Sequence, residues 1–253
     1  MDTNRIAELL EPFLTDSSHL IKSCHSERSE ESRFESHATL SQLQLQNIST
    51  YIDLLLRWNA RINLTAIRQP EAIVTRHFGE SIFAARQLFP KTPTWGQPTK
   101  PALSQAEGAV QAEQNSAQSV IDLGSGAGFP GMPIKIWAPE IALTLIESNQ
   151  KKATFLREVT RALTLTNINV FSDRAEHYSN PSTQVVTLRA VERFESMLPT
   201  ATNLVAPKGR LALLISEAQL ALVQSLTPTF TWTSPKPVPL SSSRILLIGI
   251  REP

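Results

Sequence analysis

Apolar residues recur every three or four positions in three stretches near the start of the chain. These stretches cover residues 5–14, 40–59 and 70–88. The spacing places apolar side chains on one face of an α-helix, so the pattern predicts three amphipathic helices. Together they predict a helical N-terminal extension over residues 1–89.

Two segments interrupt this pattern. Residues 15–39 are polar, charged and rich in serine, and residues 90–118 combine prolines with Gln, Ala, Ser and Thr. Neither segment has an apolar face to bury, and such long irregular stretches are uncommon inside a compact domain. We therefore expect 15–39 to be a disordered insert and 90–118 to be a low-complexity linker or insert.

From residue 119 onward, short β-rich runs alternate with helical segments. The predicted strands are 119–123, 142–147, 167–171, 184–188, 210–215, 229–233 and 244–250. The clearest helix covers 149–163, with Ser148 or Asn149 placed to cap it. This alternation predicts a mostly parallel seven-stranded sheet with helices on both faces, a Rossmann-like α/β domain over 119–253. No helix separates the last two strands, which predicts an antiparallel last strand.

Composition narrows the class of protein. Of the 253 residues, 41% are hydrophobic, but the apolar runs are far shorter than the roughly 20 residues of a membrane-spanning helix. The first residues lack the basic and apolar regions of a secretory signal, and the lone Cys24 excludes an intramolecular disulfide or a Cys-based zinc site. We expect a soluble, cytoplasmic, monomeric protein without a metal site. A net charge of only +1 means that any RNA contact must be a local patch.

The most informative segment is VIDLGSGAGFPGMPIKIW, residues 120–137. Asp122 comes near the end of a predicted strand, and glycines follow at positions 124, 126, 128 and 131 before a helical pattern resumes. Glycines let a backbone turn sharply and approach a ligand closely, and a helix start offers free N–H groups. Such a loop is typical of a site for a nucleotide-like cofactor.

Two cofactors compete for this loop. Residues 126–131 match the GxGxxG pattern of dinucleotide sites, whereas Asp122 with Gly124, Gly126 and Gly128 matches the loop of methyltransferases that use S-adenosylmethionine (SAM). The acid favours SAM, because a carboxylate attracts its sulfonium and ammonium groups and repels a pyrophosphate. Pro130 also removes an N–H that a pyrophosphate would use. A tight turn with no ligand is the third interpretation.

Acidic residues follow the next two strands as well. Glu147 ends the second strand, where a carboxylate accepts hydrogen bonds from the ribose of either cofactor. Residues 173–176, Asp-Arg-Ala-Glu, follow the third strand and could meet an adenine edge. The alternatives are a solvated carboxylate for Glu147 and a helix-capping turn for 173–176.

Segments in a fixed order resemble one known family. They are RWNARINLTAI (57–67), RHFGES (76–81), VIDLGSGAGFPGMPI (120–134), LIESNQKKATFLREV (145–159), RAE (174–176), TLRAV (187–191) and PKGR (207–210). Together they resemble the glucose-inhibited division protein B (RsmG) family of bacterial 16S ribosomal RNA guanine-N7 methyltransferases. The resemblance implies a class I SAM-dependent methyltransferase behind a helical extension. Its partner would be 16S rRNA, in the small subunit or in an assembly intermediate.

The resemblance also implies site residues. The family's SAM contacts fall on Gly124, Phe129, Ala175, Glu176 and Arg189, and the physical argument above adds Asp122, Gly126, Gly128 and Glu147. Arg189 ends a strand and could hold an RNA phosphate or the methionine carboxylate, or serve only as a salt-bridge partner. Glu80 stands where family members usually have Asp.

Guanine N7 already carries an exposed lone pair, and a methyl on a sulfonium is activated. We therefore expect catalysis by positioning, with no general base. Arg76, His77, Glu80 and Arg189 are the candidates near the acceptor, with a buried histidine as the alternative for His77. The candidate RNA-binding cations are Arg57, Arg61, Arg76, Lys151 and Lys152, or else these are solvated helix faces. Competing functions are a SAM-dependent methyltransferase with another substrate, an NAD-dependent oxidoreductase and a non-catalytic nucleotide-binding module.

Overall fold

The computed structural model describes residues 1–15, 39–91, 117–179, 182–189 and 194–253. The expected inserts at 15–39 and 90–118 lie almost entirely outside these residues, and both stay predictions. The described residues form the α/β architecture that the sequence predicts.

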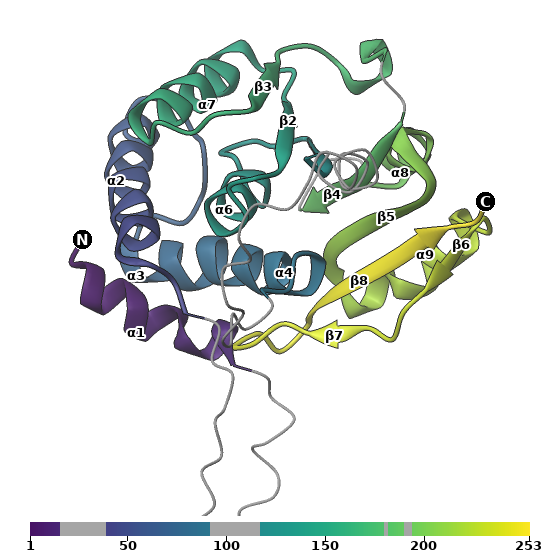
Figure 1. Ribbon diagram of the computed structural model, residues 1–253, viewed down its shortest axis with the longest axis horizontal. Helices are drawn as coiled ribbons and strands as arrows, with labels where there is room; N and C mark the ends of the chain where they lie inside the picture. The colour runs from purple at the N-terminus through teal and green to yellow at the C-terminus, as the bar shows by residue number, and fades with distance from the viewer. Residues whose placement is uncertain (16–38, 92–116, 180–181, 190–193) are drawn as a thin grey trace, which may run out of the picture.

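The centre of the fold is one twisted sheet with the strand order β3-β2-β1-β4-β5-β8-β6 (Figure 1). Its strands are β1 (Ser119–Leu123), β2 (Ala142–Ile146), β3 (Ile168–Phe171), β4 (Thr183–Arg189), β5 (Val205–Ser216), β6 (Phe230–Trp232), β7 (Lys236–Pro237) and β8 (Arg244–Arg251). The first five pair in parallel, and β8 is antiparallel to β5 and β6, as predicted.

One strand was not predicted from the sequence. The connection between β6 and β8 contains the two-residue strand β7, which pairs with β8 and makes the sheet eight-stranded instead of seven-stranded. A two-residue strand that ends in proline has no hydrophobic alternation to reveal it.

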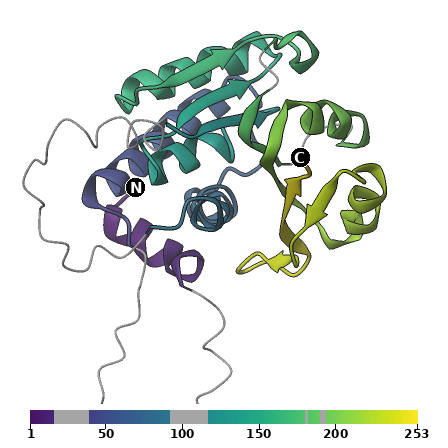
Figure 2. The ribbon, with the colours of Figure 1, turned by 45° about the vertical axis from the view of Figure 1, so that its right-hand side comes forward.

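Two apolar cores lie on opposite faces of the sheet. Along β1, Val120 belongs to one core while Ile121 and Leu123 belong to the other, as the alternation of side chains in a strand requires. The first core is covered by α6 (Gly131–Trp137) and α7 (Gln150–Ala162), and the second by α8 (Phe194–Leu204) and α9 (Leu220–Leu226) (Figures 1 and 2). Asn149 caps α7 as predicted, because its side chain accepts from the Lys151 and Lys152 N–H groups.

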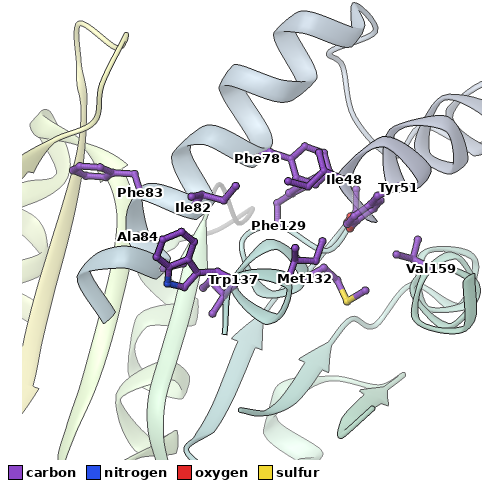
Figure 3. Close-up of a cluster of buried hydrophobic side chains, with 14 of the residues drawn as sticks. Ile48, Tyr51, Phe78, Ile82, Phe83, Ala84, Phe129, Met132, Trp137 and Val159 are labelled. Carbon is purple, nitrogen blue, oxygen red and sulfur yellow. The ribbon is translucent and has the colours of Figure 1, made fainter. Parts of the chain in front are cut away.

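The N-terminal helices extend the first core. They are α1 (Thr3–Leu14), α2 (Gln42–Asn59), α3 (Pro70–Ile73) and α4 (Glu80–Leu88). Figure 3 shows side chains from α2, such as Tyr51, against Phe129 and Met132 of the glycine loop and α6. The helical extension and the sheet therefore share one continuous core.

The third predicted helix, 70–88, is not a regular α-helix. A π-helix, Val74–Gly79, separates α3 from α4 and carries Arg76 and His77. Apolar spacing cannot reveal one wide turn inside a helix, because the residues on either side keep a helical pattern. Such turns occur frequently at functional sites.

Within the described ranges, no helix combines the length and the apolar composition needed to cross a bilayer. The same ranges hold no group of three His, Cys, Asp or Glu side chains arranged to bind a metal ion.

Candidate functional site

The glycine loop joins β1 to α6 at the carboxyl edge of the sheet. Gly124, Gly126 and Gly128 have φ angles of 69°, 57° and 88°, in the left-handed region that side chains disfavour. At Gly128, a Cβ atom would also come within 2.3 Å of the Tyr51 hydroxyl. The glycines are therefore required by backbone conformation and, at position 128, by packing.

The N–H groups of this loop are directed into the protein. Those of Gly124 and Ser125 both donate to the Ile146 carbonyl, at 2.9 and 3.0 Å. The Gly126 N–H donates to Glu147 at 2.8 Å, and the Gly131 N–H donates to Asp122 at 3.1 Å. The loop is thus held by its own hydrogen bonds.

Asp122 lies in β1, directly beneath the glycine loop. Its carboxylate is fully buried and accepts from the Thr187 hydroxyl at 2.8 Å as well as from the Gly131 N–H. Burial raises its pKa to about 6, although both hydrogen bonds lower it. Asp122 therefore supports the loop from below, where α6 begins against it, and its contact with a cofactor stays a prediction. A Cβ on Gly131 would lie 2.7 Å from the Asp122 Cβ atom.

The other predicted cofactor residues gather at the same edge. Glu147 is 7% exposed, and its two oxygens accept from the Gly126 and Asn149 N–H groups, both at 2.8 Å. Ala175 is buried in a 3₁₀-helix, Ala175–His177, that follows β3, and Glu176 beside it is exposed. These positions lie at the carboxyl ends of β1, β2 and β3, where open parallel sheets bind their ligands.

Phe129 of the glycine loop lies between two rings from the N-terminal helices. It stacks on Tyr51 with centroids 5.4 Å apart and on His77 with centroids 4.6 Å apart. The Tyr51 hydroxyl donates to the Ala127 carbonyl, and burial raises the pKa of this phenol well above its ordinary value. The N-terminal helices therefore fix the loop on the side away from the sheet.

His77 is buried and has partners at both ring nitrogens. Nδ1 lies 3.1 Å from the Arg189 guanidinium, which can only donate, so Nδ1 is the acceptor and Nε2–H donates to Thr65 at 2.8 Å. Burial, followed by the charges of Arg189, Arg244 and Arg76, lowers the His77 pKa to about 3. His77 is thus neutral near pH 7. It is a buried histidine with both ring nitrogens bonded, which is the alternative interpretation of this residue.

The RWNARINLTAI segment explains how Thr65 reaches His77. The Asn59 side chain accepts from the Leu64 and Thr65 N–H groups at 2.9 and 3.1 Å and donates to the Thr65 carbonyl. These three bonds fix the turn after α2, and with it the Thr65 hydroxyl.

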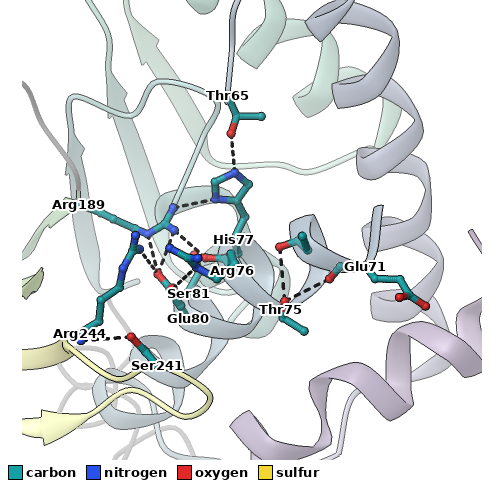
Figure 4. Close-up of polar contacts among 11 residues, drawn as sticks. Thr65, Glu71, Thr75, Arg76, His77, Glu80, Ser81, Arg189, Ser241 and Arg244 are labelled. Carbon is teal, nitrogen blue, oxygen red and sulfur yellow. Dashed lines mark hydrogen bonds and ion pairs between the residues drawn. The ribbon is translucent and has the colours of Figure 1, made fainter. Parts of the chain in front are cut away.

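Glu80 is the centre of a cluster of three arginines (Figure 4). One oxygen accepts from Arg189 at 2.9 Å and from Arg244 at 2.7 Å, and the other accepts from Arg76 at 3.3 Å. Arg189 also donates to the Arg76 carbonyl at 2.6 Å. We call Arg76, Glu80, Arg189 and Arg244 the arginine cluster.

This geometry shows which contacts already hold two of the candidates, and their roles at the acceptor and the cofactor stay predictions. Glu80 is 1% exposed with both oxygens engaged, so it orders the three arginines. The Arg189 guanidinium contacts Glu80, His77 and the Arg76 carbonyl, so it is a salt-bridge partner in this structure. The sequence did not assign Arg244 to the site, because 164 residues separate it from Glu80.

The remaining RNA-binding candidates lie outside this cluster. Arg57 and Arg61 are exposed at and after the end of α2, and Lys151 is exposed in the first turn of α7 with Lys152 half-buried beside it. Trp58 donates to Glu158 at 3.0 Å and packs on Phe155, so it seals the contact between α2 and α7.

Comparison with known proteins identifies the family. The family model described as "rRNA small subunit methyltransferase G" matches residues 44–93 and 104–240. This chain belongs to that family. It is 36% identical to ribosomal RNA small subunit methyltransferase G of Chloroflexus aggregans, over 68% of this chain and 66% of that protein. The same protein of Staphylococcus carnosus is 32% identical, over 69% of this chain and 65% of that protein. The matched part spans slightly less than two thirds of each relative's length.

One solved structure shares the fold of this chain. Ribosomal protein L11 methylase of Lactobacillus delbrueckii subsp. bulgaricus matches with a TM-score of 0.52, at 10% identity, over 70% of this chain and 79% of that chain. The fold is that of a class I SAM-dependent methyltransferase, as predicted.

Proposed function

We propose that this chain transfers a methyl group from SAM to N7 of a guanine in 16S rRNA. The observation that carries the cofactor assignment is the closed hydrogen bonding of the glycine loop. The N–H groups of residues 124 and 125 donate to the Ile146 carbonyl, and those of 128 and 129 donate to the Ser125 carbonyl. The N–H groups of 126 and 131 donate to two carboxylates, those of Glu147 and Asp122. A pyrophosphate needs free donors and is repelled by carboxylates, whereas SAM carries a sulfonium and an ammonium group. The loop therefore favours SAM over NAD.

Several residues at this edge would hold the cofactor. Gly124, Gly126 and Phe129 form the loop, Glu147 stands at the end of β2, and Ala175 with Glu176 follow β3. When bound, SAM supplies a methyl group on a sulfonium, which is an activated leaving group. At Gly126, an added Cβ would meet no atom closer than 3.8 Å, so this side of the loop is open to a ligand.

The chain's own residues would act by positioning the acceptor. His77 is neutral with both nitrogens occupied, and Glu80 is covered by arginines, so neither serves as a general base. Guanine N7 needs none, because its lone pair is already exposed. Holding N7 in line with the methyl group can supply about 7–11 kcal/mol of the barrier.

Family membership supports 16S rRNA as the partner, since the relatives are named as small-subunit rRNA methyltransferases. The exposed cations Arg57, Arg61, Lys151 and the half-buried Lys152 are available for RNA phosphates. We propose a cytoplasmic monomer that acts on the small subunit or an assembly intermediate.

The test is methyl transfer from labelled SAM to small subunits that lack the modification. We expect label in 16S rRNA at one guanine, located by borohydride and aniline cleavage, which is selective for N7-methylguanosine. Label on another atom or another molecule would replace the proposed acceptor, and binding of NADH without SAM in calorimetric titrations would replace the cofactor.

The variant that tests the cofactor site is Gly126→Asn. Asparagine tolerates the left-handed backbone at this position, and its side chain would enter the open side of the loop. We expect a folded protein that has lost SAM binding and methyl transfer together.

A further inference from the structure

Arg76 and Arg244 are the more exposed arginines of the cluster, and they differ from the buried Arg189. Arg189 has a side chain only 7% exposed, and its guanidinium contacts Glu80, His77 and the Arg76 carbonyl. The side chains of Arg76 and Arg244 are 47% and 32% exposed, and each guanidinium has a single contact with Glu80. The Arg189 guanidinium is therefore engaged on all its nitrogens, whereas Arg76 and Arg244 are partly exposed and each contacts Glu80 through one nitrogen.

Among the described residues, the cluster holds an excess of positive charge. Three arginines surround one glutamate, and His77 is neutral. Asp122 also lies close enough to Arg189 to interact, and counting it still leaves the group positive. Cations this close repel one another, and the charges of Arg244 and Arg76 accordingly lower the Arg189 pKa, after burial as the main cause. A bound anion would relieve this repulsion.

Of the four cluster residues, Arg244 borders a cavity. A hollow of about 300 Å³ lies beside Arg244 and is lined by Phe194, Ser216, Gln219 and Ser243 among others. It lies beyond the carboxyl end of β5, on the same edge of the sheet as the glycine loop. An anion at Arg244 would therefore have space beside it for the group that carries it.

The position of β8 separates this place from the cofactor loop. In the sheet, β8 lies three strands from β1, a distance of about 14 Å at ordinary strand spacing. The Arg244 backbone is thus set apart from the loop after β1, although its guanidinium reaches inward to Glu80 beside Arg189. The acceptor would lie on the β8 side of this edge, and the cofactor would lie beside the loop.

We propose that Arg76 and Arg244, held apart by Glu80, bind one phosphate of the RNA strand that carries the methylated guanine. This inference rests on the proposed function. Arginine presents its donors as a planar fork that matches two phosphate oxygens, and a buried carboxylate between two arginines fixes both forks before RNA arrives. The sugar or base next to this phosphate would occupy the cavity beside Arg244.

The experiment measures binding of unmodified small subunits, with SAM present, over a range of salt concentrations. The variants are Arg76→Gln and Arg244→Gln, with Lys208→Gln as the control. Lys208 is exposed near the start of β5, at the opposite edge of the sheet, and its loss removes the same charge. We expect each arginine variant to weaken binding about ten-fold and to reduce the slope of log K against log salt by about one. Lys208→Gln should leave the slope unchanged.

Two further measurements separate a phosphate contact from a structural role. SAM affinity by calorimetry should stay at the wild-type value in both arginine variants, and Arg244→Lys should recover the salt slope because it keeps the charge. Salt slopes equal to that of Lys208→Gln would overturn the proposal, and so would a parallel loss of SAM affinity. Failure of the proposed function would look different, because the wild-type chain would then bind subunits without methylating them.

Discussion

The glycine loop and the arginine cluster lie at the same edge of the sheet but are built in opposite ways. The loop is closed by partners near in sequence, since Asp122 and Gly131 are nine residues apart and Gly126 and Glu147 are 21 apart. In the cluster, Glu80 is 109 residues from Arg189 and 164 from Arg244. The N–H groups of the loop are thus bonded by nearby residues, and Tyr51 and Thr187 add hydrogen bonds from more distant parts of the chain. The cluster depends mainly on distant partners and exists only when the whole chain has folded.

The two regions also differ in charge. The loop has two carboxylates beside it, the fully buried Asp122 and the nearly buried Glu147, which take up two of its N–H donors. The cluster has partly exposed guanidinium groups around a buried carboxylate. A cationic cofactor suits the first and a polyanion suits the second. The edge is therefore divided into two halves of opposite character, and substitutions in each half should have separable effects.

The largest effect is expected at Glu80. Replacing it by glutamine leaves three arginines without a counter-charge at a position that is 1% exposed. Breaking a buried ion pair from one side typically costs about 3–5 kcal/mol of unfolding free energy. Urea unfolding measures this loss.

Glu8→Gln is the control for Glu80→Gln, since Glu8 pairs with Arg5 on the exposed face of α1 and its loss should cost no more than about 1 kcal/mol. Equal stability of the two variants would mean that the cluster does not depend on Glu80.

The next effect is the pH dependence of stability, and it tests Asp122 beneath the glycine loop. Asp122 has a pKa of about 6 in the folded protein against an ordinary 3.8, so the folded state holds this proton more tightly. Its contribution to stability is therefore fully present below about pH 4 and is lost as the pH rises through 6, by roughly 3 kcal/mol in all. Asp122→Asn removes this dependence. Its amide oxygen can accept from the Gly131 N–H, and its NH2 can donate to the Thr187 hydroxyl, which then donates to the Ile121 carbonyl. The unfolding free energy of Asp122→Asn minus that of the wild type should increase from pH 4 to pH 7.

His77 acts in the opposite direction, because its pKa of about 3 lies below the ordinary 6.5. Its contribution is present above pH 6.5 and is lost as the pH falls toward 3. Since both proteins contain His77, the difference between them isolates Asp122. A difference that stays level with pH would show that the carboxyl is not perturbed.

A third prediction separates backbone conformation from packing inside the loop. Gly126 and Gly128 both have positive φ, but only at Gly128 would a Cβ clash, with Tyr51, Met132 and Leu156. Gly126→Ala should therefore lose about 1 kcal/mol from conformation alone. Gly128→Ala should lose about 1–3 kcal/mol more from overpacking. Thermal unfolding of the pair checks this, and equal losses would contradict the packing explanation.

The contrast between the glycine loop and the arginine cluster also explains which parts of the site could be predicted from the sequence. The strand ends, the glycine positions, the cap at Asn149 and the gathering of Asp122, Glu147 and Ala175 at one edge follow from local patterns. The direction of the Asp122 side chain does not, because it depends on how α6 packs over β1.

The arginine cluster was harder to predict for a related reason. Arg76, His77 and Glu80 were candidates, but their mutual contacts depend on a π-helix that periodicity cannot show. Arg244 joins them through the antiparallel insertion of β8 next to β5, which brings the end of the chain to this edge. No local signal marks an arginine at the start of a strand as a partner for a helix residue 164 positions away.

The smallest effect is expected at Tyr51, where the N-terminal helices contact the loop. Tyr51→Phe keeps the stack on Phe129 and removes only the hydrogen bond to the Ala127 carbonyl, which is worth about 1 kcal/mol. If that bond keeps the loop in its binding conformation, SAM affinity should fall roughly five-fold, while the salt dependence of RNA binding stays at the wild-type slope. Trp58→Phe is the control, because Trp58 lies on the same helix and loses one hydrogen bond to Glu158 away from the loop. Calorimetric titration with SAM distinguishes the two. An equal loss in both variants would mean that α2 supports the whole core and has no specific influence on the loop, and a changed salt slope in Tyr51→Phe would mean that the two halves of the edge are coupled.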